Sequence, residues 1–149
     1  MGGETVELYK RENYLKKIRG FYKDPDIIKV ITGVRRCGKS SLMKTIMEEL
    51  EEQGIANENI ILIDLDSKVY RNVKSSVQLE SEIEKYALIK GMKYLFIDEI
   101  QNVDGFEEVI NAYRGEGDYS IFITGSNSYL TTYFPLSRES RMKDNFGIY

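Results

Sequence analysis

The sequence predicts an α/β fold in which a mainly parallel β-sheet lies between two layers of helices. Three observations lead to this prediction. Short apolar runs alternate with amphipathic stretches of helical spacing between residues 26 and 127, the pattern of strand and helix in turn. The runs are largely uninterrupted, which is typical of strands covered on both faces. Three of them end in small or polar residues, at the edge where such sheets bind ligands.

The first expected strand spans 26–33 and leads into a helix over 39–54. In that helix Leu42, Ile46 and Leu50 recur every four residues and form an apolar stripe. The elements that follow are a strand over 59–66, a helix over 76–91 with Leu79, Ile83 and Ala87 on one face, a strand over 93–100, a helix over 105–117 with Phe106, Val109, Ile110 and Tyr113 inward, and a strand over 119–127.

A chain of 149 residues fits a single domain with a core of its own. We expect the core over 26–130, an N-terminal helix over about 5–22 and a divergent tail over 131–149. The packing residues expected in the N-terminal helix are Leu8, Leu15 and Ile18.

Composition excludes several classes of function. The net charge is −3, so direct nucleic-acid binding by this segment is not supported by an overall basic footprint. The absence of histidine and the single cysteine exclude a zinc site and a Ser-His-Asp triad. No apolar run is long enough to cross a membrane, and the first residues lack the apolar stretch of a secretory signal. One cysteine fits a reducing, cytoplasmic location.

Residues 33–40 match the phosphate-loop pattern G-x-x-x-x-G-K-[ST] without a mismatch. Glycine lets backbone N–H groups turn toward phosphates, and the following helix adds its dipole. Lys39 would reach the β- and γ-phosphates, and Ser40 would ligate Mg²⁺. The expected nucleotide-binding residues are Gly33, Val34, Arg35, Arg36, Cys37, Gly38, Lys39, Ser40 and Ser41.

Two of these loop residues have alternative roles. Cys37 could be a redox switch, because a helix N-terminus lowers a thiol's pKa, but a small residue that fits the loop is the favoured interpretation. Arg36 and its neighbour Arg35 could touch phosphate, or could pair with nearby carboxylates instead.

The third strand ends in an acidic pair, Asp98 and Glu99. Asp98 would hold Mg²⁺ directly or through water, and Glu99 would polarise the attacking water as a general base. The alternative for Glu99 is a solvated strand end. No NKxD-like motif for reading the base occurs, which counts against a GTPase.

The fourth strand ends in hydroxyl and amide groups that could sense the γ-phosphate. The candidates are Thr124, Ser126 and Asn127, of which Asn127 is favoured as a catalytic residue beside Glu99 and Lys39. The alternative is ordinary turn chemistry after a strand.

Three segments together resemble the AAA+-type prokaryotic ATPase family, whose members carry an ATPase domain followed by an uncharacterised C-terminal domain. The segments are KVITGVRRCGKSSLM, YLFIDEIQNVDGFEEVINAYR and IFITGSNSYL, within residues 8–130. The resemblance implies a three-layer αβα P-loop NTPase core of the additional-strand (ASCE, AAA+-like) type. Another strand then separates the acidic-pair strand from the phosphate-loop strand, and the sheet order is first, fourth, third, second.

The resemblance also implies roles for single residues. Lys39 and Ser40 take the Walker A roles, and Asp98 and Glu99 take the Walker B roles. The polar end of TGSN takes the first sensor role. Gln101, which follows the acids, relays to a neighbouring subunit or to substrate.

After residue 130 the chain departs from the family pattern. The family continues with a helix, an arginine-bearing segment, a fifth strand and a second domain, whereas residues 131–149 read TTYFPLSRESRMKDNFGIY. We therefore expect the C-terminal strand and lid to be missing, and an exposed sheet edge to favour self-association. Arg138 and Arg141 are candidates for phosphate-sensing arginines, with an alignment that the sequence leaves open.

Three functions stay open on this basis. The first is Mg²⁺-dependent ATP hydrolysis, weak in isolation, with ATP or ADP and Mg²⁺ as ligands. The second is a truncated remnant that binds nucleotide without significant turnover. The third is a small-molecule kinase, for which only residues 138–143 could form a basic lid. The expected partners are a nucleotide, a second copy of the chain and an unidentified protein, with no membrane.

Overall fold

A five-stranded sheet forms the centre of the molecule in the computed structural model. The structure describes residues 12–13, 15–32, 38–125 and 146–148. At residues 32, 38–40 and 146–148 it describes the backbone alone. The strand order is β2-β3-β4-β1-β5. The strands are β1 (Lys29–Thr32), β2 (Ile60–Asp64), β3 (Lys93–Asp98), β4 (Tyr119–Gly125) and β5 (Phe146–Ile148). The first four pair in parallel, in the order predicted from the resemblance. The α/β fold with a mainly parallel sheet is therefore confirmed.

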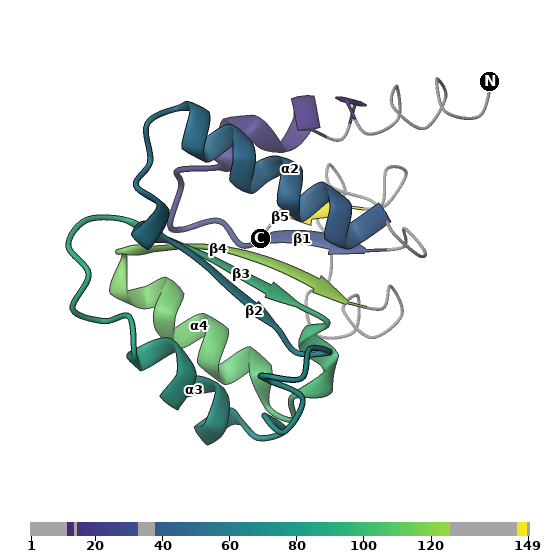
Figure 1. The fold of residues 1–149 in the computed structure, drawn as a ribbon, viewed down its shortest axis with the longest axis vertical. Helices are drawn as coiled ribbons and strands as arrows, with labels where there is room; N and C mark the ends of the chain where they lie inside the picture. The colour runs from purple at the N-terminus through teal and green to yellow at the C-terminus, as the bar shows by residue number, and fades with distance from the viewer. Residues whose placement is uncertain (1–11, 14, 33–37, 126–145, 149) are drawn as a thin grey trace.

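Helices cover both faces of the sheet, which makes the fold three-layered as predicted (Figure 1). Helix α2 (Gly38–Glu52) lies on one face, and α3 (Ser76–Glu84) and α4 (Phe106–Glu116) lie on the other. Three short 3-10 helices complete the described elements: η1 (Arg19–Phe21), η2 (Asn57–Asn59) and η3 (Ile100–Asn102).

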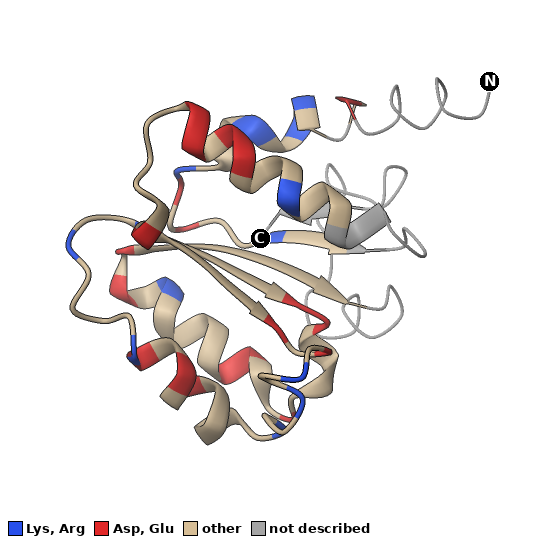
Figure 2. Ribbon diagram, in the orientation of Figure 1, with Lys and Arg blue, Asp and Glu red and all other residues tan. Residues whose placement is uncertain are grey.

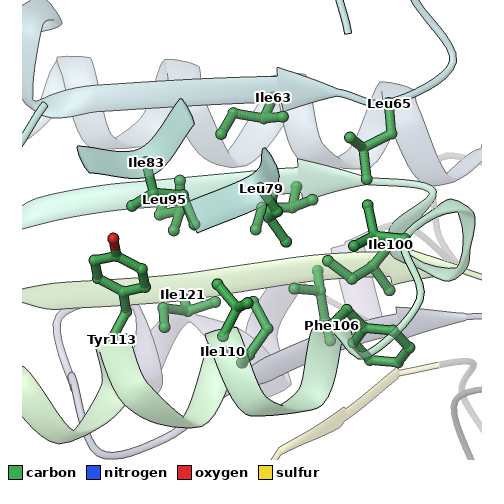
Figure 3. Close-up of a cluster of buried hydrophobic side chains, with 14 of the residues drawn as sticks. Ile63, Leu65, Leu79, Ile83, Leu95, Ile100, Phe106, Ile110, Tyr113 and Ile121 are labelled. Atoms are coloured by element: carbon green, nitrogen blue, oxygen red, sulfur yellow. The ribbon is translucent and has the colours of Figure 1, made fainter. Parts of the chain in front are cut away.

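Each face of the sheet has its own apolar core. On the α2 side the predicted stripe of Leu42, Ile46 and Leu50 is buried against Phe96 and Phe122. On the other side α3 and α4 bury their apolar faces against β2, β3 and β4 (Figure 3). The four inward residues predicted for α4 are all buried: Phe106, Val109, Ile110 and Tyr113.

Helix α3 is shorter than the sequence predicts. It begins where predicted, with a capping box in which Ser75 and Gln78 bond reciprocally. It ends at Glu84 instead of 91, and Ala87, predicted on its buried face, is exposed. The Asn59 side chain donates to the carbonyls of Lys90 (2.9 Å) and Met92 (3.1 Å). These bonds hold the segment before β3 in a non-helical path that periodicity does not reveal.

Strand β5 is a further difference from the sequence prediction. It pairs antiparallel with β1 along Lys29–Ile31, at the edge where no strand was expected from the tail. Three residues are too few for a hydrophobic pattern to indicate a strand. The β1 edge is therefore paired within the chain, and the predicted self-association stays a prediction.

The N-terminal segment packs on α2. Residues 12–13 and 15–18 are helical, and Leu15 and Ile18 are buried in the α2-side core; Leu8 lies outside the described residues. Arg19 donates to Glu49 of α2 from Nε (2.8 Å) and Nη2 (2.9 Å). This bidentate contact holds the N-terminal segment against α2.

Two lysines are buried at the amino ends of the strands. Lys29 Nζ donates to the carbonyls of Asp24 (2.9 Å) and Ile27 (2.7 Å) and to Ser120 Oγ (2.7 Å). Lys93 Nζ donates to the Ile89 carbonyl and to Asp118 Oδ2, both at 3.2 Å. Each ammonium group also lies over an aromatic ring, which stabilises its charge. Both lysines thereby tie strand starts to their neighbours.

Burial lowers the pKa of Lys29 to about 7, against the opposing attraction of Asp24. Between pH 7 and about 10 the unfolded chain therefore binds more protons than the folded chain, so this lysine's contribution to stability rises with pH. We expect the free energy of unfolding of wild type to gain about 1–2 kcal/mol, relative to Lys29→Met, between pH 7 and pH 9. Urea titrations at both pH values measure it. The exposed Lys68→Met is the control, and parallel profiles for wild type and Lys29→Met would refute the prediction.

Candidate active site

The strand ends that carry the predicted polar clusters lie together at the carboxyl edge of the sheet. Strand β3 ends at Asp98 and β4 ends at Gly125, while β1 ends at Thr32, shortly before α2 begins at Gly38. Because β4 lies between β3 and β1, its end lies between the end of β3, where the acidic pair begins, and the end of β1. The convergence is confirmed for the residues that the structure describes.

Part of the predicted site lies outside the described residues. This holds for Gly33, Val34, Arg35, Arg36, Cys37, Ser126, Asn127, Arg138 and Arg141. For Gly38, Lys39 and Ser40 the backbone alone is described, in the first turn of α2. Ser41, in the same turn, is half-buried, and its carbonyl accepts from Thr45 Oγ1 at 3.1 Å. The roles assigned to these residues stay predictions.

Asp98 is buried at the end of β3, with 5% of its surface exposed. The hydroxyl of Thr124 on β4 donates to its Oδ1. A buried carboxylate needs such partners, because burial without them is costly. The acid is therefore held in one orientation at the site's edge.

Glu99 has a left-handed backbone, with φ 61° and ψ 51°. It is the one non-glycine residue with positive φ in the described part of the chain. Its N–H donates to Thr124 Oγ1 at 3.0 Å, and the 3-10 helix η3 begins directly after it. A left-handed glutamate costs free energy and persists where surrounding contacts hold it. At Glu99 the chain therefore leaves the path that a continuing strand would take.

Thr124 connects the two acids. Its hydroxyl donates to Asp98 and accepts from the Glu99 N–H, so one side chain fixes both members of the pair. The sequence named Thr124 as a candidate but favoured Asn127. Among the described residues Thr124 is the one shown to contact the acidic pair from β4.

Gln101, on η3, contacts the second acid through its side chain. Its Nε2 donates to Glu99 Oε2 at 2.5 Å. The resemblance implied that Gln101 acts toward a neighbouring subunit or substrate. The described contact is with the acidic pair itself.

Asp64 is a further candidate site residue, and sequence reasoning missed it. It ends β2 directly opposite Asp98 in the parallel register. Burial raises the pKa of the Asp64 carboxyl, and the Asp98 and Glu99 carboxylates raise it further, against the N–H of Asp66. The available signal was an apolar strand ending in acid next to the acidic-pair strand. Figure 2 shows acidic residues at the ends of both strands.

The donor set of this edge fits a hard cation that is shared with a phosphate ligand. In the described part of the chain no three His, Cys, Asp or Glu residues form a ready cage for a metal. Mg²⁺ ordinarily uses one or two carboxylates and keeps its remaining positions for water and phosphate oxygens. Asp98, one buried carboxylate, meets that requirement.

No described helix is both long and apolar enough to span a bilayer.

Comparison with known proteins agrees with the fold described above. The family model described as "AAA domain" matches residues 25–140. An uncharacterised protein of Haemophilus influenzae is 44% identical over 124 residues, which are 83% of this chain and 31% of that protein. An uncharacterised protein of Methanocaldococcus jannaschii is 32% identical over 128 residues, 85% of this chain and 27% of that protein.

The chain spans less than a third of the length of these two relatives. No solved structure matches it significantly. The family match covers residues 25–140, well over half of the chain. The chain therefore belongs to the AAA domain family.

Proposed function

We propose that this chain binds ATP or ADP together with Mg²⁺ and hydrolyses ATP. Membership of the AAA domain family indicates nucleotide binding of the ATPase type; hydrolysis and its Mg²⁺ dependence are the finer proposal. The observation that carries the proposal is the acidic pair, which Thr124 holds at the carboxyl edge of the sheet. Glu99 follows Asp98 directly and has its own fixed backbone, so the two carboxylates can take different roles.

Each role follows from chemistry and position. The loop over 33–37 and the first turn of α2 would surround the phosphates, with Lys39 on the β- and γ-phosphates. Ser40 and Asp98 would hold Mg²⁺, which supplies neutralising charge for the phosphate oxygens when it is bound. Glu99 would accept a proton from water as the water oxygen bonds to the γ-phosphorus. The bond from that phosphorus to the β,γ-bridging oxygen breaks, and ADP and phosphate leave.

The test measures nucleotide binding by calorimetry and phosphate release with Mg²⁺ for wild type and Lys39→Ala. A charge-assisted contact is worth about 1.5–3 kcal/mol, so we expect Lys39→Ala to weaken ATP binding by roughly 10–100-fold. Lys44→Ala is the matched control, because Lys44 is exposed on the same helix. Unchanged ATP binding in Lys39→Ala would overturn the proposal. Binding without phosphate release would favour a nucleotide-binding remnant, and transfer to a small acceptor would favour a kinase.

A further inference from the structure

The contact between Gln101 and Glu99 is short and local. The left-handed turn at Glu99 starts η3, and the Asn102 N–H closes that turn on the Glu99 carbonyl at 3.1 Å. Within it, Gln101 Nε2 donates to Glu99 Oε2 at 2.5 Å. Hydrogen bonds to a carboxylate are stronger than those between neutral groups. The amide is therefore a substantial restraint on the glutamate side chain.

The other amide atom of Gln101 distinguishes this contact from ordinary packing. Gln101 Oε1 is buried and has no hydrogen-bond partner among the described residues. A buried acceptor without a partner is costly. A side chain that served only to fill space would not need an amide group. The hydrogen bond that the structure shows for this amide is the one from Nε2 to Glu99.

The Glu99 backbone and side chain are held by different residues. Thr124 Oγ1 accepts from the Glu99 N–H and so fixes the main chain. The carboxylate lies beyond that bond, on rotatable side-chain torsions, where Gln101 holds it. We propose that Gln101 is a positioning residue that holds the Glu99 carboxylate for its reaction with water, an inference that rests on the proposed hydrolysis. A base held in its reactive geometry has less orientational freedom to lose in the transition state.

The first readout does not need activity. The chain has three glutamines, Gln53, Gln78 and Gln101, so NMR of ¹⁵N-labelled glutamine side chains gives few signals, and Gln101→Met assigns the one of interest. We expect one Gln101 amide proton to be shifted downfield in the nucleotide-free protein, and to lose that shift in Glu99→Ala. An unshifted signal, or one that Glu99→Ala leaves in place, would overturn the proposal.

The second readout is turnover. Gln101→Met keeps the length of the side chain and removes the donor, so we expect kcat to fall about tenfold with KM and nucleotide affinity unchanged. In Glu99→Gln, the same Gln101→Met change should cause no further loss, because both changes act through one carboxylate. Gln53→Met, at an exposed glutamine, is the control for loss of an amide.

The outcomes separate this proposal from the proposed function. An impaired Glu99→Gln beside a fully active Gln101→Met overturns the positioning role alone. Equal losses from Gln101→Met in both backgrounds overturn it as well, because they indicate a structural effect. A fully active Glu99→Gln overturns Glu99 as the base, and the positioning role with it.

Discussion

Glu99→Gln is expected to reduce phosphate release from ATP by about 10²–10⁴-fold while nucleotide affinity stays within about twofold of wild type. Glutamine keeps the shape of the side chain but cannot take the proton of the attacking water. Asp98 and the Glu99 main chain should stay in place, because Thr124 binds both of them. Single-turnover phosphate release, with binding measured by calorimetry, separates the two effects.

Glu108→Gln is the matched control for this change. Glu108 lies exposed on α4, and its replacement should leave both binding and release unchanged. If Glu99→Gln released phosphate at the wild-type rate, Glu99 would not be the general base. If it lost nucleotide binding instead, its role would lie in the ground-state complex.

Phe122→Ala is expected to lower the free energy of unfolding by about 3–5 kcal/mol, the range for removing a fully buried phenyl ring. Phe122 is completely buried in the middle of β4. Its ring stacks on Phe96 at 4.3 Å between centroids, and Tyr22 meets it edge-on at 5.8 Å. Lys29 Nζ lies 4.8 Å from its centroid. The truncation therefore leaves a cavity and removes contacts with the sheet, the N-terminal segment and a buried ammonium group.

Urea denaturation of wild type and Phe122→Ala measures this loss. Leu88→Ala is the control, since Leu88 is 97% exposed and surface changes of this kind shift stability by less than about 0.5 kcal/mol. A Phe122→Ala protein as stable as Leu88→Ala would show that the aromatic cluster does not hold the sheet together.

The parts of this molecule that sequence predicts well are those fixed by burial. Four covered strands and the stripes of α2 and α4 follow from the requirement that apolar residues recur at the period of their element. Parallel strands have their carboxyl ends at the same edge of the sheet, so the sequence also predicts that Asp98 and Thr124 lie at one edge. The strand order came from family resemblance, because periodicity does not order strands.

The missed features depend on single contacts between distant segments. The non-helical path before β3 is held by Asn59, which donates to the carbonyls of Lys90 and Met92 some thirty residues further along the chain. The left-handed turn at Glu99 is unfavourable for glutamate on its own, so no local preference predicts it. Asp64 gains significance only from its register with Asp98. That Thr124 contacts both acids likewise depends on how β4 lies against β3.

Lys93, buried at the amino edge of the sheet, lies at the start of the strand register that ends at the candidate site. Lys93 starts β3 opposite Tyr119 on β4, and the same offset continues to Ile97 opposite Ile123. One residue further along both strands, Asp98 meets the Thr124 hydroxyl. Sliding one strand by a single residue would turn its side chains to the other face of the sheet. The contacts of Lys93 at the start of β3 therefore help to fix the register of β3 and β4. That register brings Asp98 to the Thr124 hydroxyl at the other end of the two strands.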